Sequence, residues 1–228
     1  MIKIYLPTVL VLITLMISVQ LFSQTKISYH ERFYDKRMKW SEISNEEKGY
    51  LTILTDSREY FLESVNEKMI IGEYGLKLDA KQDFSYSINY LGDENALIGI
   101  SGDNVKISFE IDIWEKKYRV NYTKKGKYKL GNWKKLEAKT LSPDIEKFSL
   151  KILFKNNTYH FYYNNFHITD LIAGKIDKLK YFNKLQIGTS MVLDVSDVFI
   201  DGYVFLNEYQ GFLDGEGLSQ KELEKQGF

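Results

Sequence analysis

Residues 148–166 constrain the fold of this chain more than any other stretch. The pair Asn156-Asn157 separates two runs in which every second residue is apolar. Period-two alternation on both sides of a short polar turn predicts a β-hairpin with one apolar face. Because an isolated hairpin is only marginally stable in water, a larger sheet or a second sheet must cover that face. The apolar positions are Leu150, Ile152, Phe154, Tyr159, Phe161 and Tyr163.

The rest of the chain repeats short apolar runs between polar turns, such as Gly102-Asp103-Asn104 and Lys125-Gly126. Evenly spaced strands predict an all-β fold, a two-sheet antiparallel jelly-roll sandwich. Since no linker rich in Pro, Gly or Ser divides the chain, we expect one β-sandwich domain over residues 24–205. The expected strands cover residues 49–55, 59–65, 75–78, 84–91, 96–101, 105–113, 117–123, 136–138, 148–154, 158–163, 184–188 and 195–205.

The two ends of the chain differ from this β-rich middle. Residues 1–23 begin with a short positive segment, Met1-Ile-Lys3. An almost wholly apolar run from Ile4 to Phe22 follows, and the small residue Ser23 comes after it. This pattern predicts a secretory signal peptide, which is cleaved to leave Gln24 near the mature N-terminus. The alternative is an uncleaved membrane anchor, because the apolar run nearly reaches the length that spans a bilayer. In the tail, residues 206–228, a capping box at 219–222 predicts a short C-terminal helix.

Composition narrows the class of protein. The 228 residues include 31 Lys+Arg and 31 Asp+Glu, so the net charge of zero provides no field to attract nucleic acid. The basic run at 124–129 is either a solvated hairpin tip or a contact for a polyanion. The chain has no cysteine, so an exported domain must rely on its core alone. The signal and the Lys, Asn and Tyr bias suggest a bacterial exported protein, secreted, periplasmic or on the cell surface.

Several short motifs occur in an order that resembles a known fold family. Over residues 29–205 the chain resembles the concanavalin A-like lectin/glucanase jelly-roll superfamily, in the form of bacterial exported domains of the 3-keto-disaccharide hydrolase type. The resemblance implies two curved antiparallel sheets and, in sugar-active members, a ligand on the concave face. The motifs are Phe33–Asp35, Trp40, Gly49–Leu51, Asp83–Ile88, Asn95–Ile100, Phe109–Ile111, Tyr118–Val120, Trp133, the hairpin, Leu185–Gly188 and Val195–Asp201.

One pattern suggests catalysis. Glu110, Asp112 and Glu115 resemble the Glu-x-Asp-x-x-Glu pattern of laminarinase-type glycoside hydrolases with this jelly roll, which implies a nucleophile, an electrostatic helper and an acid/base. Retaining hydrolysis needs its two carboxyls about 5 Å apart. On a flat strand Glu110 and Glu115 would lie about 16 Å apart on opposite faces, so catalysis requires a β-bulge. The alternative is an ordinary strand whose isoleucines are buried and whose acids point outward.

The candidate ligand-binding residues are aromatic. They lie near turns, or they alternate with the residues that are expected to be buried. Sugar rings stack on exposed indole and phenol faces, although packing between strands explains each aromatic residue by itself. These candidates are Trp114, Trp133, Tyr122, Tyr128 and Tyr162.

Cofactor and metal signals are weak. His30, His160 and His167 lie on separate segments without the spacing of a transition-metal site, and no phosphate loop or dinucleotide fingerprint occurs. We therefore expect no metal and no cofactor.

These observations predict a secreted, non-catalytic jelly-roll module that binds a glycan or a cell-surface protein on its concave face. We expect it to contact no nucleic acid and, after signal cleavage, no membrane. The alternative is a carbohydrate-active hydrolase, either a retaining glycosidase that uses Glu110 and Glu115 or an enzyme similar to 3-keto-glycoside hydrolases. Convergence of the two carboxyls in an open groove would favour the hydrolase, and separation would favour binding.

Overall fold

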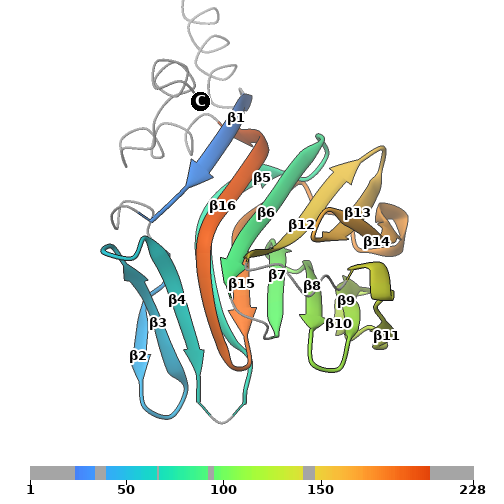
Figure 1. Ribbon diagram of the computed structural model, residues 1–228. Coiled ribbons are helices and arrows are strands. Elements are labelled where there is room, and N and C mark those ends of the chain that lie inside the picture. The colour runs from blue at the N-terminus through green and yellow to red at the C-terminus, as the bar shows by residue number, and fades with distance from the viewer. Residues whose placement is uncertain (1–23, 34–39, 66, 92–94, 141–146, 206–228) are drawn as a thin grey trace, which may run out of the picture.

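The computed structural model describes residues 24–33, 40–65, 67–91, 95–140 and 147–205 (Figure 1). The described residues are almost entirely β-strands and turns, with two short 3-10 helices, η1 (Ala138–Thr140) and η2 (Ala173–Lys175). The strands are β1 (Gln24–Glu31), β2 (Ile43–Asn45), β3 (Gly49–Leu54), β4 (Glu59–Ser64), β5 (Ile70–Asp79), β6 (Phe84–Leu91), β7 (Ala96–Ser101), β8 (Lys106–Asp112), β9 (Lys117–Lys124), β10 (Lys127–Lys129), β11 (Lys134–Lys135), β12 (Lys147–Lys155), β13 (Thr158–Tyr163), β14 (Phe166–Ile172), β15 (Tyr181–Thr189) and β16 (Val192–Phe205).

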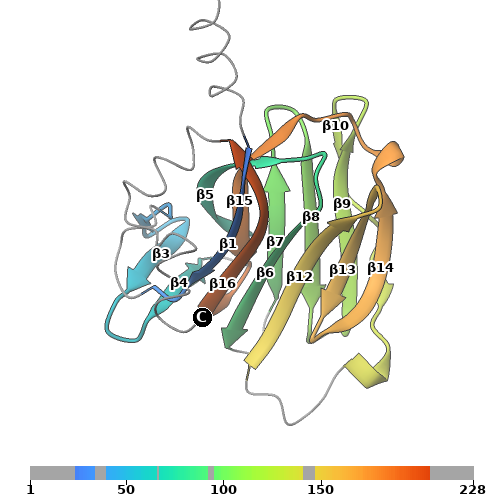
Figure 2. The ribbon, with the colours of Figure 1, turned by 90° about the horizontal axis from the view of Figure 1, so that it is seen from above.

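Hydrogen bonds connect these strands into one antiparallel sheet that folds into two layers. Sheet A has the strand order β10-β9-β8-β7-β15-β5, with β11 also paired to β9, and sheet B has the order β16-β6-β12-β13-β14. The layers are joined where β16 meets β5, at the pair Val204 and Leu78. Figure 2 shows β12, β13 and β14 as one layer in front of β7, β8 and β9. This arrangement confirms the predicted all-β jelly-roll sandwich.

A smaller group of strands extends sheet B beyond β16. Both β1 and β4 pair with β16, and β3 and β2 continue outward from β4 (Figure 1). The predicted signal peptide at 1–23 and the predicted helix in 206–228 lie outside the described residues. Among the residues that the structure does describe, no helix has the length and apolar character needed to cross a membrane.

The hairpin predicted at 148–166 is confirmed. Leu150 pairs with Tyr163 and Phe154 pairs with Tyr159, which places the alternating apolar side chains on one face. Asn156 and Asn157 both have positive φ, 51° and 58°. A two-residue loop with two positive φ angles matches the right-handed twist of a hairpin, and asparagine tolerates this conformation well. The turn therefore fixes the register that the alternation requires.

The main errors of the sequence prediction lie at the edges of the sheets. Residues 136–138 were expected as a strand, but Leu136 is a buried anchor just before η1, and no strand forms there. The sequence also failed to predict β1. It missed β14 and the short strands β2, β10 and β11 as well, and the side chains of these four are largely exposed. An edge strand has few buried positions, so its sequence carries little period-two alternation.

Aromatic and aliphatic side chains fill the space between the layers. The rings of Phe109 on β8 and Phe161 on β13 have centroids 5.3 Å apart, and both residues are fully buried. The hydroxyl of Tyr86 on β6 donates a 3.1 Å hydrogen bond to the backbone oxygen of Gln186 on β15, so this buried polar atom also links the two sheets. Burial of these side chains provides the main free energy that holds the sandwich together.

Phe161→Ala should strongly destabilise the protein, because it leaves a cavity where the two sheets meet. We expect a loss of about 3–5 kcal/mol in the free energy of unfolding, measured by urea denaturation. Phe166→Ala is the matched control. Its side chain lies half-exposed on β14, so the loss should stay below about 1 kcal/mol. Equal losses for the two variants would contradict this assignment of the core.

Candidate functional site

The face of sheet A that points away from the core carries a connected group of polar side chains. Because Phe109 of β8 faces the core, its neighbours Ser108 and Glu110 lie on the opposite side of the sheet. The register places Asn121 beside Ser108 and Arg119 beside Glu110. We call the whole group the polar face, and its members are Glu73, Lys106, Ser108, Glu110, Arg119, Asn121, Tyr128, Trp133, Lys184 and Gln186.

A buried ion pair lies near the edge of the polar face. Arg119 Nε donates to Glu110 Oε2 at 2.6 Å, and Nη2 donates to Oε1 at 3.0 Å. The Glu110 side chain is only 7% exposed and that of Arg119 is 22% exposed. The fork-to-fork geometry satisfies both carboxylate oxygens and holds the guanidinium in one orientation. The pair is therefore a rigid part of the face.

A chain of hydrogen bonds continues from this ion pair. Asn121 Nδ2 donates to Ser108 Oγ at 3.2 Å, and the Ser108 hydroxyl lies 2.8 Å from the hydroxyl of Tyr128. The backbone N–H of Gly131 donates to Asn121 Oδ1 at 2.9 Å. Ser108 and Asn121 are almost completely buried, whereas Tyr128 is 43% exposed. The network thus has a buried polar floor and an aromatic rim that reaches solvent.

Trp133 forms the other part of this rim. Its indole ring lies 4.4 Å from the guanidinium carbon of Arg119 and 5.6 Å from Lys117 Nζ. The ring is 37% exposed. Contact with two cations orients an aromatic ring through its negative face. Trp133 is therefore a partly exposed ring in a fixed position beside charged hydrogen-bonding groups.

A second polar group occupies the β15 and β5 side of the face. Glu73 accepts hydrogen bonds from Lys184 Nζ at 2.5 Å and Gln186 Nε2 at 2.6 Å. Burial raises the pKa of Glu73, but these two hydrogen bonds outweigh it and hold the pKa below its usual value. Burial lowers the pKa of Lys106, opposed by the charge of Glu73. Glu73 is therefore ionised at neutral pH.

One buried atom of this group lacks a partner. Among the described residues, no donor forms a hydrogen bond to Gln186 Oε1. A β-carbon added at Gly99 would lie 3.2 Å from this oxygen and 3.1 Å from the backbone oxygen of Ile107. An unsatisfied buried acceptor is rare in folded proteins and calls for an explanation.

Two of the three predicted catalytic residues, Glu110 and Asp112, lie on β8, and the third, Glu115, lies in the turn that follows. Strand β8 ends at Asp112, and residues 113–116 form the turn to β9. Glu110 binds Arg119, whereas Glu115 is 68% exposed in the turn and lies 3.4 Å from Lys117. Asp112 accepts a hydrogen bond from the Glu115 backbone N–H at 2.8 Å, which shapes the turn. The bulged strand that catalysis required is replaced here by a hairpin turn.

The five predicted ligand-binding aromatic residues occupy different places. Trp133 and Tyr128 lie on the polar face, and Trp114 is 67% exposed in the turn after β8. Tyr122 was expected to point outward, but it packs against the core, because it lies opposite the buried Ile107 in the pairing of β8 with β9. Tyr162 lies on sheet B, where its ring contacts His167. The structure therefore brings two of the five together.

The basic run at 124–129 forms a hairpin tip. Lys124 pairs with Lys127, and the backbone N–H groups of Lys125 and Gly126 donate to the Asp177 carboxylate at 2.7 Å each. These two hydrogen bonds lower the pKa of Asp177. The tip is thus attached to the segment after η2, in agreement with the hairpin interpretation of this run.

Sequence reasoning missed most of the polar face. Alternation on β8 showed that Glu110 points away from the core, but the role of Arg119 depends on the register across the β8–β9 turn. Gln186 and Glu73 lie more than 100 residues apart in the chain, and their contact depends on the pairing of β15 with β5. No local spacing in the sequence reports such a contact.

Comparison with solved structures identifies proteins of the same architecture. A protein of unknown function with a galectin-like fold from Bacillus subtilis has a TM-score of 0.55 at 11% identity, over 80% of this chain and 99% of that one. A Bacillus licheniformis β-glucanase has a TM-score of 0.54 at 10% identity, over 77% and 97%. Zobellia galactanivorans β-agarase B has a TM-score of 0.54 at 8% identity, over 80% and 95%.

These likenesses confirm a concanavalin A-like jelly-roll fold. Identities this low show the fold alone, and the finer resemblance to the 3-keto-disaccharide hydrolase type stays a prediction. No family model matches the chain, and no curated protein matches its sequence.

Arg119→Ala should destabilise the protein more than the loss of an exposed ion pair, because it leaves the buried Glu110 carboxylate without its cation. We expect a loss of about 3 kcal/mol in the free energy of unfolding. Lys139→Ala, which removes an exposed pair with Glu137 at 2.7 Å, is the control and should cost less than about 1 kcal/mol. Chemical denaturation of both variants measures the difference, and similar losses would show that the Glu110 pair is not effectively buried.

Proposed function

We propose that this protein binds a glycan on the polar face of sheet A and does not hydrolyse it. The observation that carries this proposal is the position of Trp133. Its half-exposed ring is fixed against Arg119, beside the Tyr128 hydroxyl network. An aromatic platform next to directed hydrogen-bonding groups suits a sugar ring, which has apolar C–H surfaces and polar hydroxyl groups.

Two further observations support a carbohydrate ligand. Two of the similar structures are named as a β-glucanase and a β-agarase, and both names refer to enzymes that act on carbohydrate. The unpaired Gln186 Oε1 lies in the same polar face. A ligand hydroxyl group that donated a hydrogen bond to this atom would satisfy a buried acceptor, which is energetically favourable.

The hydrolase alternative is less well supported by the geometry. Glu110 would have to give up a two-point ion pair with Arg119 before it acted as a nucleophile, and Glu115 lies in an exposed turn bound to a different cation. A retaining mechanism depends on two carboxyls that face one bond from opposite sides. The polar face therefore suits binding better than bond cleavage by these two residues.

The proposal is tested by a glycan array followed by calorimetry on the glycans that bind. Trp133→Ala should weaken binding by about tenfold or more, equivalent to about 1.4 kcal/mol. Tyr162→Ala removes an aromatic side chain from sheet B and should leave the affinity unchanged. Binding that responds to Tyr162→Ala and not to Trp133→Ala would move the site to sheet B. Absence of binding to any glycan would refute the proposal and favour a protein partner.

The same glycans should be screened for hydrolysis. We expect no release of reducing ends by the purified protein. Turnover that is lost in both Glu110→Gln and Glu115→Gln would instead establish the retaining glycosidase. Turnover that survives both changes would indicate an enzyme whose catalytic groups lie elsewhere, such as one similar to 3-keto-glycoside hydrolases.

We also propose that the protein is exported, on the basis of the apolar run at residues 1–23. N-terminal sequencing of the protein recovered outside the cytoplasm should begin near Gln24. A protein that retains Met1 and sediments with membranes would favour the anchor instead.

A further inference from the structure

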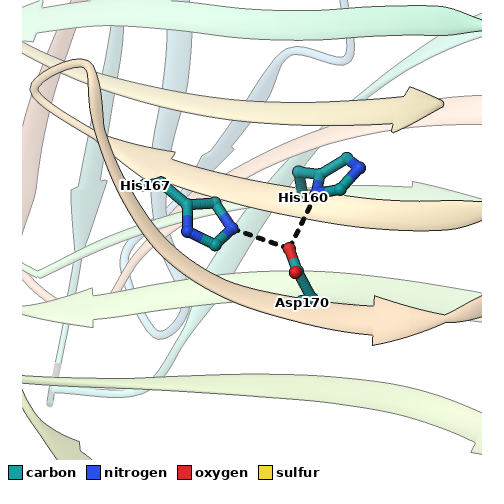
Figure 3. A group of neighbouring side chains, drawn as sticks. All are labelled: His160, His167 and Asp170. Carbon is teal, nitrogen blue, oxygen red and sulfur yellow. Dashed lines mark hydrogen bonds and ion pairs between the residues drawn. The ribbon is translucent and has the colours of Figure 1, made fainter.

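Three metal-binding side chains meet on the outer face of sheet B, on the opposite side of the molecule from the polar face. His160 comes from β13, and His167 and Asp170 come from β14 (Figure 3). His160 Nδ1 and His167 Nε2 each lie 2.7 Å from the same carboxylate oxygen, Asp170 Oδ1. The three potential ligand atoms all lie within 4.8 Å of one another.

A β-bulge brings these residues onto one face. His167 and Asp170 are three residues apart, and in a regular strand such residues point to opposite faces. The pairing of β13 with β14 shifts register between Phe161 and Tyr162, so that Ile168 is the extra residue of β14. As a result, Asp170 lies directly opposite His160, while His167 lies opposite Tyr162. Bulges commonly redirect side chains next to functional sites.

The shared oxygen carries the negative charge of the cluster. Burial raises the pKa of Asp170, but the hydrogen bonds from His167 and His160 outweigh this effect and hold the pKa below its usual value. The carboxylate is therefore ionised at neutral pH. Both imidazole nitrogens point at this oxygen, so each ring is already oriented toward a single position. Side-chain exposures of 25% for His160, 48% for His167 and 46% for Asp170 leave that position accessible from solvent.

We propose that His160 Nδ1, His167 Nε2 and Asp170 Oδ1 bind a divalent transition-metal ion of the Zn²⁺ class. Two imidazoles and one carboxylate favour such an ion over Ca²⁺ or Mg²⁺, which prefer oxygen ligands. Three protein ligands leave a coordination position for water or an external donor.

Binding of a tetrahedral ion would change all three distances between the ligand atoms, including the distance between the two ring nitrogens, which now lie within 4.8 Å of each other. Tetrahedral Zn²⁺ with bonds of about 2.0–2.1 Å holds its ligand atoms about 3.3 Å apart. Each imidazole nitrogen now lies 2.7 Å from the carboxylate oxygen. Each N–O distance would therefore grow by about 0.6 Å, a movement that partly exposed side chains on the edge strand β14 and its neighbour β13 can make. In each neutral ring, the proton on the ligating nitrogen would transfer to the other ring nitrogen.

This site escaped the sequence analysis because its spacing is not that of a metal motif within one helix or loop. His160 lies on β13, whereas His167 and Asp170 lie on β14, where the bulge places both of them on the outer face. His30, the remaining histidine of the chain, lies elsewhere on sheet B, where it pairs with Asp197 at 2.8 Å and stacks on Phe199. The ring signals of His160 and His167 can therefore report metal binding at the proposed site, and His30 serves as a control away from it.

Titration of the purified protein with ZnCl₂ tests the proposal. Calorimetry should show saturable binding of one Zn²⁺ per chain, and NMR should show shifts in the ring signals of His160 and His167 with little change for His30. His167→Ala and Asp170→Asn should each weaken Zn²⁺ binding by at least about tenfold, since loss of even an outer-shell partner costs this much. His30→Ala should bind Zn²⁺ as the unchanged protein does.

A melting-temperature series separates metal binding from a purely structural role. Zn²⁺ should raise the melting temperature of the unchanged protein and of His30→Ala, but not that of His167→Ala. If the cluster only connects β14 to β13, the melting temperature of Asp170→Asn should be lower than that of the unchanged protein, and Zn²⁺ should change the melting temperature of no variant. The absence of saturable binding, or equal shifts of all three histidine rings, would overturn the proposal.

Discussion

The ring of Phe109 packs against the ring of Phe161 between the two sheets, and the placement of the polar surfaces depends on this kind of contact. A regular β-strand alternates its side chains, so once Phe109 is fixed in the core, Ser108 and Glu110 must point away from it. The same argument places His160 on the outer face of sheet B, because its neighbours Tyr159 and Phe161 are buried. Core packing thus determines which side chains are available for binding on each face.

Both candidate sites lie where a regular ladder is interrupted near an edge. Between β10 and β11, the pairing with β9 changes register around Gly131, whose backbone N–H binds Asn121. In β14, the bulge at Ile168 brings His167 and Asp170 to one face. A regular strand cannot gather side chains in this way, because its alternation is strict. Burial of apolar side chains therefore determines the centre of the fold, and irregularities at the sheet edges bring the side chains of the candidate sites together.

Local features made much of the fold predictable. The hairpin at 148–166 combines strict alternation with Asn156 and Asn157, which accept the positive φ angles of the turn, so pattern and turn chemistry agree. The sequence failed where burial was low, as in β14, and where contacts are distant, as between Glu73 and Gln186. The pattern Glu110-x-Asp112-x-x-Glu115 was visible in the sequence, but Glu115 lies in the turn after Asp112 and not on the strand that holds the other two. Residue identity alone cannot report which strands become neighbours.

We propose that carbohydrate binds to the polar face of sheet A. This proposal is tested most directly by a crystal structure of the protein with an oligosaccharide that binds in solution. We predict that a sugar ring lies against Trp133 and that its hydroxyl groups contact Arg119 or Tyr128. A sugar bound on sheet B, with the polar face unoccupied, would contradict the account.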